Sequence, residues 1–209
     1  MEQQGIKADC LLTDLPYGEV NRESNGLRNL DKAQADSATF DLNTYLRQAV
    51  KVVNGNFLVF CGTEQVSDIR KFFVAQGMTT RLLIWEKTNP SPMNGKTVYL
   101  SGIECCVYAK SRGGVFNGFC KNTVFRYPCG VNEIHPTMKP LPLWYELLRD
   151  NTNEGQLVID TCMGSWTTAV ACHKLNRNWI GFELDKDFYE RGKQRYEQFS
   201  SQISIWDIV

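Results

Sequence analysis

The fold is decided at residues 157–168, where the sequence is LVIDTCMGSWTT. A short apolar run ends in Asp160, a turn containing Gly164 follows, and a helical pattern begins at Thr167. In α/β sheets, a strand, a tight glycine turn and a helix N-terminus together form a nucleotide-binding crevice. A second apolar run ends in Glu183, where an acidic side chain can accept hydrogen bonds from both ribose hydroxyls. Taken alone, this pattern also fits an ordinary strand-to-helix connection.

Outward from this stretch, strand and helix patterns alternate along the chain. Such alternation predicts an α/β fold with a doubly wound, mostly parallel sheet. Two segments, 19–37 and 111–131, show no stable period, and the first is expected to be a long exposed loop. The expected strands are 8–13, 57–61, 81–85, 103–109, 157–160 and 179–183, and the expected helices are 41–53, 63–76, 141–151, 167–175 and 185–199.

Composition is that of an ordinary globular protein. The 209 residues suit one domain, and 43% of them are hydrophobic. We find neither a run of 18 apolar residues nor a secretory leader, so no membrane partner and a cytoplasmic location are expected. The eight cysteines form no C-x-x-C pair and only two histidines are present, which favours reduced, mostly buried thiols and no metal site.

Charge is distributed unevenly although the formal net charge is zero. Zero net charge argues against a protein that coats nucleic acid by charge alone. The segment 87–139, however, contains seven basic and only two acidic residues. Such asymmetry is typical of a surface that meets a polyanion, although solvated loops can also show it.

The tetrapeptide Asp14-Leu15-Pro16-Tyr17 follows the first expected strand directly. A carboxylate at the end of a parallel strand points into the crevice where ligands bind. An aromatic ring next to it offers a flat face on which an extruded base can stack. A capped turn after a strand is the structural alternative for these four residues.

Together these segments resemble the N4/N6 amino-methyltransferases of DNA, in particular their beta class. TDLPYG at 13–18 is similar to the D-P-P-Y-G signature, and LIWEKTNP at 83–90 resembles the strand that carries W-x-K-x-x-P. HPTMKP at 135–140 matches H-P-T-x-K-P, residues 158–168 resemble V-L-D-P-F-x-G-S-G-T-T, and IGFE at 180–183 resembles G-I-E. The resemblance spans nearly the whole chain in the order of that class, with the catalytic motif before the cofactor motif.

Two departures from the family pattern affect the prediction. Leu15 replaces the first proline of the signature, and since that residue contributes a backbone carbonyl the change is expected to be tolerated. Trp166 replaces the second glycine of G-S-G-T-T, while Thr161 and Cys162 replace Pro-Phe. A glycine at position 166 serves either a positive φ or a close approach to the cofactor. Tryptophan there implies either a backbone compatible with an L-residue or weakened cofactor binding.

The resemblance implies a Rossmann-like, S-adenosylmethionine-dependent methyltransferase domain over residues 1–209, acting on adenine N6 of a flipped base in double-stranded DNA. It implies catalytic roles for Asp14, Leu15, Pro16 and Tyr17, with the Asp14 side chain and the Leu15 carbonyl accepting the amine N–H bonds. Its cofactor-binding residues correspond to Asp160, Cys162, Gly164, Ser165, Thr167, Glu183, Thr137 and Lys139. Lys139 could pair with the cofactor carboxylate, and His135 fits either a ligand contact or packing on the sheet.

Sequence recognition in this class lies between the tryptophan-lysine strand and the H-P-T motif, here about 88–134. Cations interleaved with aromatic residues suit phosphate anchoring and base contact, which selects Lys110, Arg112, Lys121 and Arg126 as DNA-binding residues. The class also suggests a homodimer and a place in restriction-modification. The loop 19–37 could close over the flipped base.

Three alternatives stay open from the sequence. N4-cytosine methylation uses the same fold, although Asp14 favours adenine because the cytosine members more often have serine there. A DNA-binding homologue with impaired catalysis is suggested by Trp166 and the small recognition region. Methylation of protein glutamine or of RNA fits less well, because the motif order would be reversed.

Overall fold

The computed structural model describes residues 1–16, 41–92, 95–130 and 138–202. Its centre is a seven-stranded sheet with the order β5-β3-β4-β2-β1-β6-β7. The strands are β1 (Ala8–Asp14), β2 (Val53–Cys61), β3 (Thr79–Lys87), β4 (Ile103–Lys110), β5 (Val124–Tyr127), β6 (Leu157–Asp160) and β7 (Asn178–Gly181). Only β4 runs against its neighbours in this sheet, so the expected mostly parallel sheet is confirmed.

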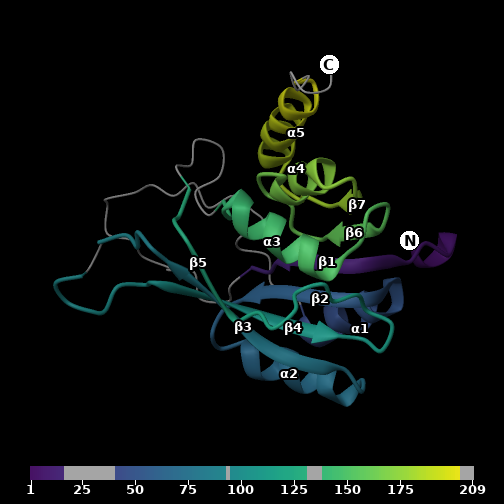
Figure 1. Cartoon of the computed structure of the whole chain (residues 1–209), viewed down its shortest axis with the longest axis horizontal. Coiled ribbons are helices and arrows are strands. Elements are labelled where there is room, and N and C mark those ends of the chain that lie inside the picture. The colour runs from purple at the N-terminus through teal and green to yellow at the C-terminus, as the bar shows by residue number, and fades with distance from the viewer. Residues whose placement is uncertain (17–40, 93–94, 131–137, 203–209) are drawn as a thin grey trace.

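Helices cover both faces of the sheet, which gives the three layers of a doubly wound fold (Figure 1). They are α1 (Leu42–Val52), α2 (Val66–Ala75), α3 (Leu141–Asn151), α4 (Thr167–Lys174) and α5 (Lys186–Ser200), and a 3-10 helix spans Glu2–Gln4. Helices α1 and α2 pack on one face, and α3 and α4 pack on the other. Helix α5 packs against α4 and lies at the end of the sheet where β7 forms the edge (Figure 1).

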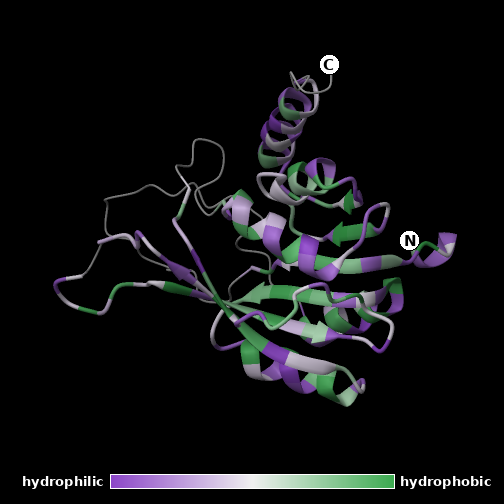
Figure 2. Ribbon diagram, viewed as in Figure 1, coloured by the Kyte–Doolittle hydropathy of each residue, from purple (hydrophilic) through white to green (hydrophobic). Residues whose placement is uncertain are grey.

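Side chains of the central strands alternate between the two faces, and the residues are apolar on both (Figure 2). In β1, Cys10 and Leu12 pack toward α3 and α4, whereas Leu11 packs toward α1 and α2. Because successive side chains of a strand point to opposite faces, Asp14 belongs to the α3 face. This alternation determines which strand-end side chains can meet above the sheet.

The sequence pattern did not predict β5, which lies within the segment 111–131 that shows no stable period. This strand has only four residues, of which Phe125 is buried. It forms by parallel pairing with β3, where Trp85 lies opposite Phe125. A strand this short is stabilised by its neighbour more than by its own pattern. The other boundaries differ by a few residues at most; β2, for example, begins at Val53 rather than at residue 57.

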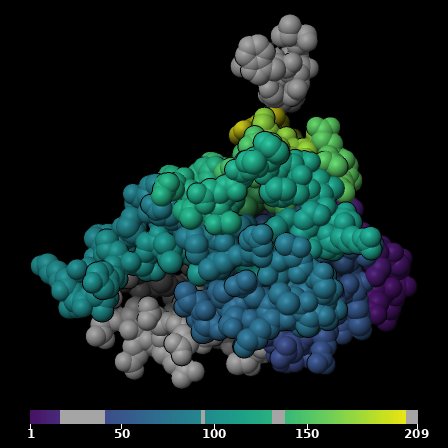
Figure 3. Space-filling view, turned by 60° about the horizontal axis from the view of Figure 1, so that its bottom comes forward, coloured from purple at the N-terminus to yellow at the C-terminus, as the bar shows by residue number. Residues whose placement is uncertain are grey.

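The connection between β3 and β4 projects away from the body of the protein (Figures 1 and 3). Among its described residues, Val98 and Tyr99 are 63% and 101% exposed. No helix among the described residues has the length and apolar character needed to cross a membrane.

Candidate functional site

The carboxyl ends of β1 and β6 lie side by side at one end of the sheet, here called the edge that carries Asp14. These strands pair in parallel, with Leu11 opposite Ile159. Just beyond, the hydroxyl oxygens of Thr13 and Thr161 are 3.0 Å apart in a hydrogen bond. The opening acid, Asp14, and the turn after Asp160 are therefore neighbours in space although they are far apart in the sequence. In open α/β sheets, ligands bind at this edge.

Asp14 is held at this edge by the strand beneath it and by a lysine from another segment. Asp14 pairs with Phe60 in the β1–β2 register, and the Leu15 N–H donates to the Phe60 carbonyl at 3.0 Å. The ammonium of Lys139, which lies just before α3, forms an ion pair with the Asp14 carboxylate. The Pro16 carbonyl accepts a hydrogen bond from the Gln65 side chain at 3.3 Å. Asp14 thus has a defined position and an ion-pair partner within the protein itself.

Lys139 pairs with a second carboxylate as well. Its Nζ lies 3.0 Å from an oxygen of Glu104, and its side chain is only 5% exposed. Burial alone would lower the pKa of Lys139, but Asp14 and Glu104 outweigh that effect, so its pKa stands above the usual value. Lys139 is consequently a fixed cation between two anions. Glu104 was not selected from the sequence, although it continues the buried alternation of Cys106 and Tyr108 on β4.

The turn after β6 is closed by hydrogen bonds to the segment after β7. The Met163 N–H donates to the Phe182 carbonyl at 2.9 Å, and the Gly164 N–H donates to Glu183 Oε2 at 2.7 Å. The other Glu183 oxygen accepts from the Asp185 N–H at 2.9 Å. Gly164 has a φ of 47°, a value that glycine adopts without strain. Glu183 therefore both shapes the turn and lies beside it.

Asp160 is buried beneath this turn. One of its oxygens accepts from the Cys162 N–H at 3.0 Å, and the other accepts from the Thr168 hydroxyl at 2.5 Å. Trp144 of α3 in turn donates to Thr168 at 2.8 Å. Burial raises the pKa of Asp160 to about 6, although these hydrogen bonds oppose the shift. Asp160 thus ties the turn to α3 and α4.

Ser165 and Thr167 are buried on the α5 side of the turn. Their hydroxyl oxygens lie 3.0 Å apart, and Arg195 of α5 donates to the Ser165 carbonyl at 2.6 Å. Arg195 also donates to the Thr167 hydroxyl at 3.1 Å. Both side chains are thus engaged within the protein, and their predicted cofactor contacts stay predictions.

The departures from the family pattern are accommodated by local contacts. The Thr161 hydroxyl, where the family has proline, bonds to Tyr45 of α1 at 2.7 Å as well as to Thr13. Trp166 has a φ of 60° and lies just before α4 in the left-handed region. Its indole packs against Trp179, Tyr189 and Tyr196. The backbone at 166 thus has the positive φ that favours glycine, and the ring is buried against α5.

The predicted DNA-binding cations lie in two places. Arg126 of β5 is 68% exposed at its side chain and pairs with Glu86, near the edge that carries Asp14. Lys110 ends the antiparallel strand β4 opposite Thr79, and so it lies at the other end of the sheet with its neighbour Arg112. Lys110 also lines a cavity of about 280 Å³ under α3, together with Lys121. The structure does not bring Lys110 and Asp14 together.

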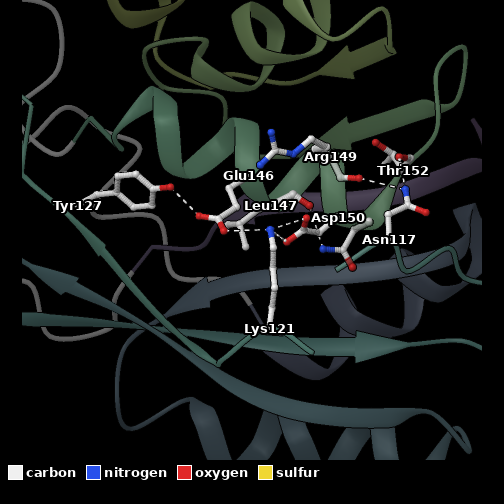
Figure 4. Close-up of polar contacts among 9 residues, drawn as sticks. Asn117, Lys121, Tyr127, Glu146, Leu147, Arg149, Asp150 and Thr152 are labelled. Atoms are coloured by element: carbon white, nitrogen blue, oxygen red, sulfur yellow. Dashed lines mark hydrogen bonds and ion pairs between the residues drawn. The ribbon is translucent and has the colours of Figure 1, made fainter. Parts of the chain in front are cut away.

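Lys121 is engaged by two acidic side chains of α3 (Figure 4). Its Nζ lies 2.6 Å from an oxygen of Asp150 and 3.0 Å from an oxygen of Glu146. Glu146 also accepts a hydrogen bond from the Tyr127 hydroxyl at 2.6 Å. Lys121 therefore connects the segment before β5 to α3. Two further predicted residues, Tyr17 and Thr137, lie outside the described residues, as does His135.

Comparison with known proteins identifies similar chains over nearly the full length. A family model described as DNA methylase matches residues 110–194. The Type II methyltransferase M2.MboI of Moraxella bovis is 27% identical over 94% of this chain and 83% of its own. The DNA adenine methyltransferase YhdJ of Escherichia coli (strain K12) is 32% identical over 34% of this chain and 24% of its own. The crystal structure of the M1.HpyAVI-SAM complex superimposes with a TM-score of 0.72 and 28% identity, covering 92% of this chain and 91% of that one.

Proposed function

We propose that this chain, which belongs to the DNA N4/N6 amino-methyltransferase family, transfers a methyl group from S-adenosylmethionine to N6 of adenine in DNA. The observation that carries the proposal is the meeting of Asp14 and the glycine turn at neighbouring strand ends, joined by the Thr13–Thr161 hydrogen bond. The likeness to a protein solved with SAM and to a DNA adenine methyltransferase supports the same conclusion.

The residues around the glycine turn fit the cofactor. Glu183 presents a carboxylate whose two oxygens accept backbone N–H groups and retain further lone pairs for ribose hydroxyls. Beside it, Phe182 and Leu184 are 52% and 75% exposed and offer apolar surface to an adenine ring. The indole of Trp166 is directed toward α5. We therefore assign the hydrogen bonds to the cofactor ribose to Glu183. The contacts that the glycine turn makes with the cofactor are assigned to Gly164 and Cys162.

Asp14 and Leu15 orient the amine that is methylated. The lone pair of adenine N6 is delocalised into the ring, so the amine is a weak nucleophile. Hydrogen bonds from its two N–H groups to the Asp14 carboxylate and the Leu15 carbonyl favour a pyramidal nitrogen with its lone pair free. S-adenosylmethionine supplies an electrophilic methyl group on sulfur when bound. Orientation and electrostatic complementarity then account for most of the rate gain.

The target base must leave the DNA stack to reach this edge, at a cost of a few kcal/mol. Stacking on Tyr17, and closure of the loop 19–37, stay part of the proposal and lie outside the described residues. We propose that 1–209 form one domain whose recognition segment spans about 88–134. Within it, Arg126 of β5 lies toward the same end of the sheet as Asp14, because β3 and β5 run parallel to β1. A homodimer and a cytoplasmic location stay predictions.

Transfer of a labelled methyl group from S-adenosylmethionine to DNA tests the proposal. We expect wild type to methylate DNA and Asp14→Ala to lose at least about 100-fold in kcat, because an acceptor used in the transition state is removed. Asp68→Asn, a surface change on α2 where Asp68 pairs with Lys71, is the control and should match wild type. Equal incorporation by Asp14→Ala and wild type would remove Asp14 from the mechanism.

Nucleoside mass spectrometry of the product separates the two amino-methylation chemistries. We expect N6-methyladenine in the methylated DNA. Detection of N4-methylcytosine alone would reassign the substrate base and leave the fold and the cofactor site in place.

A further inference from the structure

Four charged side chains form a linear cluster above the strand ends, in the order Lys87, Glu104, Lys139 and Asp14. Lys87 Nζ lies 2.8 Å from Glu104 Oε1, and Lys139 Nζ lies 3.0 Å from Glu104 Oε2. Lys139 then pairs with Asp14. Positive and negative charges alternate along this cluster, and its formal charge sums to zero. Glu104 is its central link, because each of its oxygens contacts a different lysine.

Because side chains alternate along a strand, the three members of the cluster that lie on strands share one face of the sheet. Trp85 of β3, Cys106 of β4 and Leu12 of β1 all pack toward α3. Lys87, Glu104 and Asp14 each stand two residues from one of them and so extend the same face to the edge. Lys139 enters from the segment before α3 and lies 5.7 Å from the Phe60 ring centroid. The cluster therefore lies between the sheet and the start of α3.

Three members of the cluster are largely shielded from water and Asp14 is 24% exposed, so the charges depend on one another. The side chains of Lys87 and Glu104 are each 16% exposed, and that of Lys139 is 5% exposed. Burial by itself would raise the pKa of Glu104, but Lys139 and Lys87 together hold it below the usual value. Removing one member takes a close opposite charge away from its neighbours, which costs more at a buried pair than at a surface pair.

We infer that Glu104 is a positioning residue for the proposed methyl transfer, which holds Lys139 between two carboxylates so that Asp14 stays ionised and oriented while sharing the ammonium. This inference rests on the proposed function. If Lys139 faced Asp14 alone, the ammonium would engage that carboxylate fully and weaken it as an acceptor for the amine. If Lys139 lost its proton, Asp14 would lose this ion pair. Glu104 prevents both outcomes without touching the substrate.

Other titratable groups near the cluster do not replace Glu104. Burial raises the pKa of each nearby thiol, so these thiols stay neutral at neutral pH; they belong to Cys61, Cys105 and Cys106. Among the described residues, two further carboxylates act at longer range: Glu64 on the Cys61 and Cys105 thiols, and Asp160 through its interaction with Asp14. Lys87 is the cation that offsets the charge of Glu104 from the side of β3.

The first test is the isosteric substitution Glu104→Gln, assayed for methyl transfer from pH 6 to pH 10. We expect kcat at saturating DNA to fall about 10- to 100-fold, because a misplaced orienting group costs this much. Toward pH 10 the variant should lose activity that wild type keeps, because Lys139 stays buried and has lost one of its two carboxylate partners. KM for DNA should change less than about threefold, since Glu104 makes no substrate contact. Glu104→Asp should recover part of kcat.

A charge-balanced double variant keeps the test informative if Glu104→Gln alone does not fold. Glu104→Gln alone leaves two cations facing one anion, whereas the double variant Glu104→Gln with Lys87→Gln leaves Lys139 and Asp14 as a neutral pair. The double variant should fold and show the same loss of kcat and the same loss of activity toward pH 10. The matched control is Glu197→Gln on α5, whose exposed pair with Lys193 lies outside the cluster. Its kcat and pH profile should equal those of wild type.

A measurement on the free protein separates this inference from the proposed function. Lysine side-chain NMR should show Lys139 titrating at a lower pH in the Glu104 variants than in wild type. An active wild type whose Glu104 variants keep its kcat and pH profile would overturn the inference alone. A wild type without methyl transfer to DNA, but with the expected shift of the Lys139 titration, would instead overturn the proposed function.

Discussion

The left-handed backbone at Trp166 predicts an unusual order of stability between two substitutions. Trp166 has φ 60° and ψ 28°, and its side chain packs among rings at centroid distances of 5.2 to 6.1 Å. The left-handed conformation costs an L-residue about 1–2 kcal/mol, whereas glycine adopts it freely. Packing of the buried indole offsets this strain in the wild type.

Trp166→Ala and Trp166→Gly lose the same packing but differ in strain. Truncation of a buried tryptophan costs about 3–5 kcal/mol, and both variants should lose an amount in this range. Alanine keeps the strain of the left-handed backbone, and glycine removes it. We therefore expect Trp166→Gly to be more stable than Trp166→Ala by about 1 kcal/mol. At an ordinary helical position the order is reversed, and glycine is less stable by about 0.5–1 kcal/mol.

Urea denaturation of the variants measures this difference as free energies of unfolding. The matched control is the pair Lys174→Ala and Lys174→Gly, at an exposed position of the same helix α4. Alanine should be the more stable of the two at 174, and glycine the more stable of the two at 166. An alanine variant at 166 as stable as the glycine variant would refute the left-handed backbone and the strain argument with it.

Three further predictions follow from buried contacts. Burial raises the pKa of Asp160 to about 6, so this carboxyl favours folding most below about pH 4 and its contribution is lost as the pH rises through 6. Relative to Asp160→Asn, urea denaturation should show the wild-type free energy of unfolding falling by about 2 kcal/mol between pH 4 and pH 7, and a constant difference would contradict this. Lys121→Met should lower the free energy of unfolding by about 1–2 kcal/mol, because Asp150 loses its cation. The control Lys193→Met on α5 should change it by less than about 0.5 kcal/mol, because its pair is exposed. Equal effects of the two substitutions would mean that the Lys121 ion pairs contribute nothing to stability. A Cβ at Gly192 would lie 2.1 Å from the Trp166 ring. Gly192→Ala should therefore lower the free energy of unfolding by about 1–3 kcal/mol in wild type and by little in the Trp166→Gly background. Equal losses in both backgrounds would show that the two residues are not in contact.

Much of the fold could be predicted because its elements carry strong local patterns. Helix α3 and strand β6 have the predicted bounds, 141–151 and 157–160. Strand β5 could not be predicted, because its four residues depend on pairing with β3. The apolar alternation that identifies strands is too short there to be distinguished from a loop.

The residues of the candidate site could be predicted segment by segment, but the contact between Asp14 and Lys139 could not. Asp14 and the turn at Gly164 are each recognisable locally, whereas the pairing of Asp14 with Lys139 joins residues that are 125 positions apart. That pairing depends on strand order, and strand order is a property of the whole sheet. The role of Glu104 could have been predicted from the alternation of side chains along β4. Glu104 shares a face with the buried residues Cys106 and Tyr108, and a charged residue on a buried face needs a partner.

The residues that depart from the family pattern make contacts of their own in this chain, and position 166 adopts a left-handed backbone without being glycine. Trp166 keeps the positive φ that a glycine would have, and its ring is buried against α5. Thr161 replaces a proline, and its hydroxyl holds the turn through Thr13 and Tyr45. Leu15 replaces another proline and anchors the strand end through its N–H, which proline lacks. Each of these three replacements brings a contact of its own to the turn or to the end of β1.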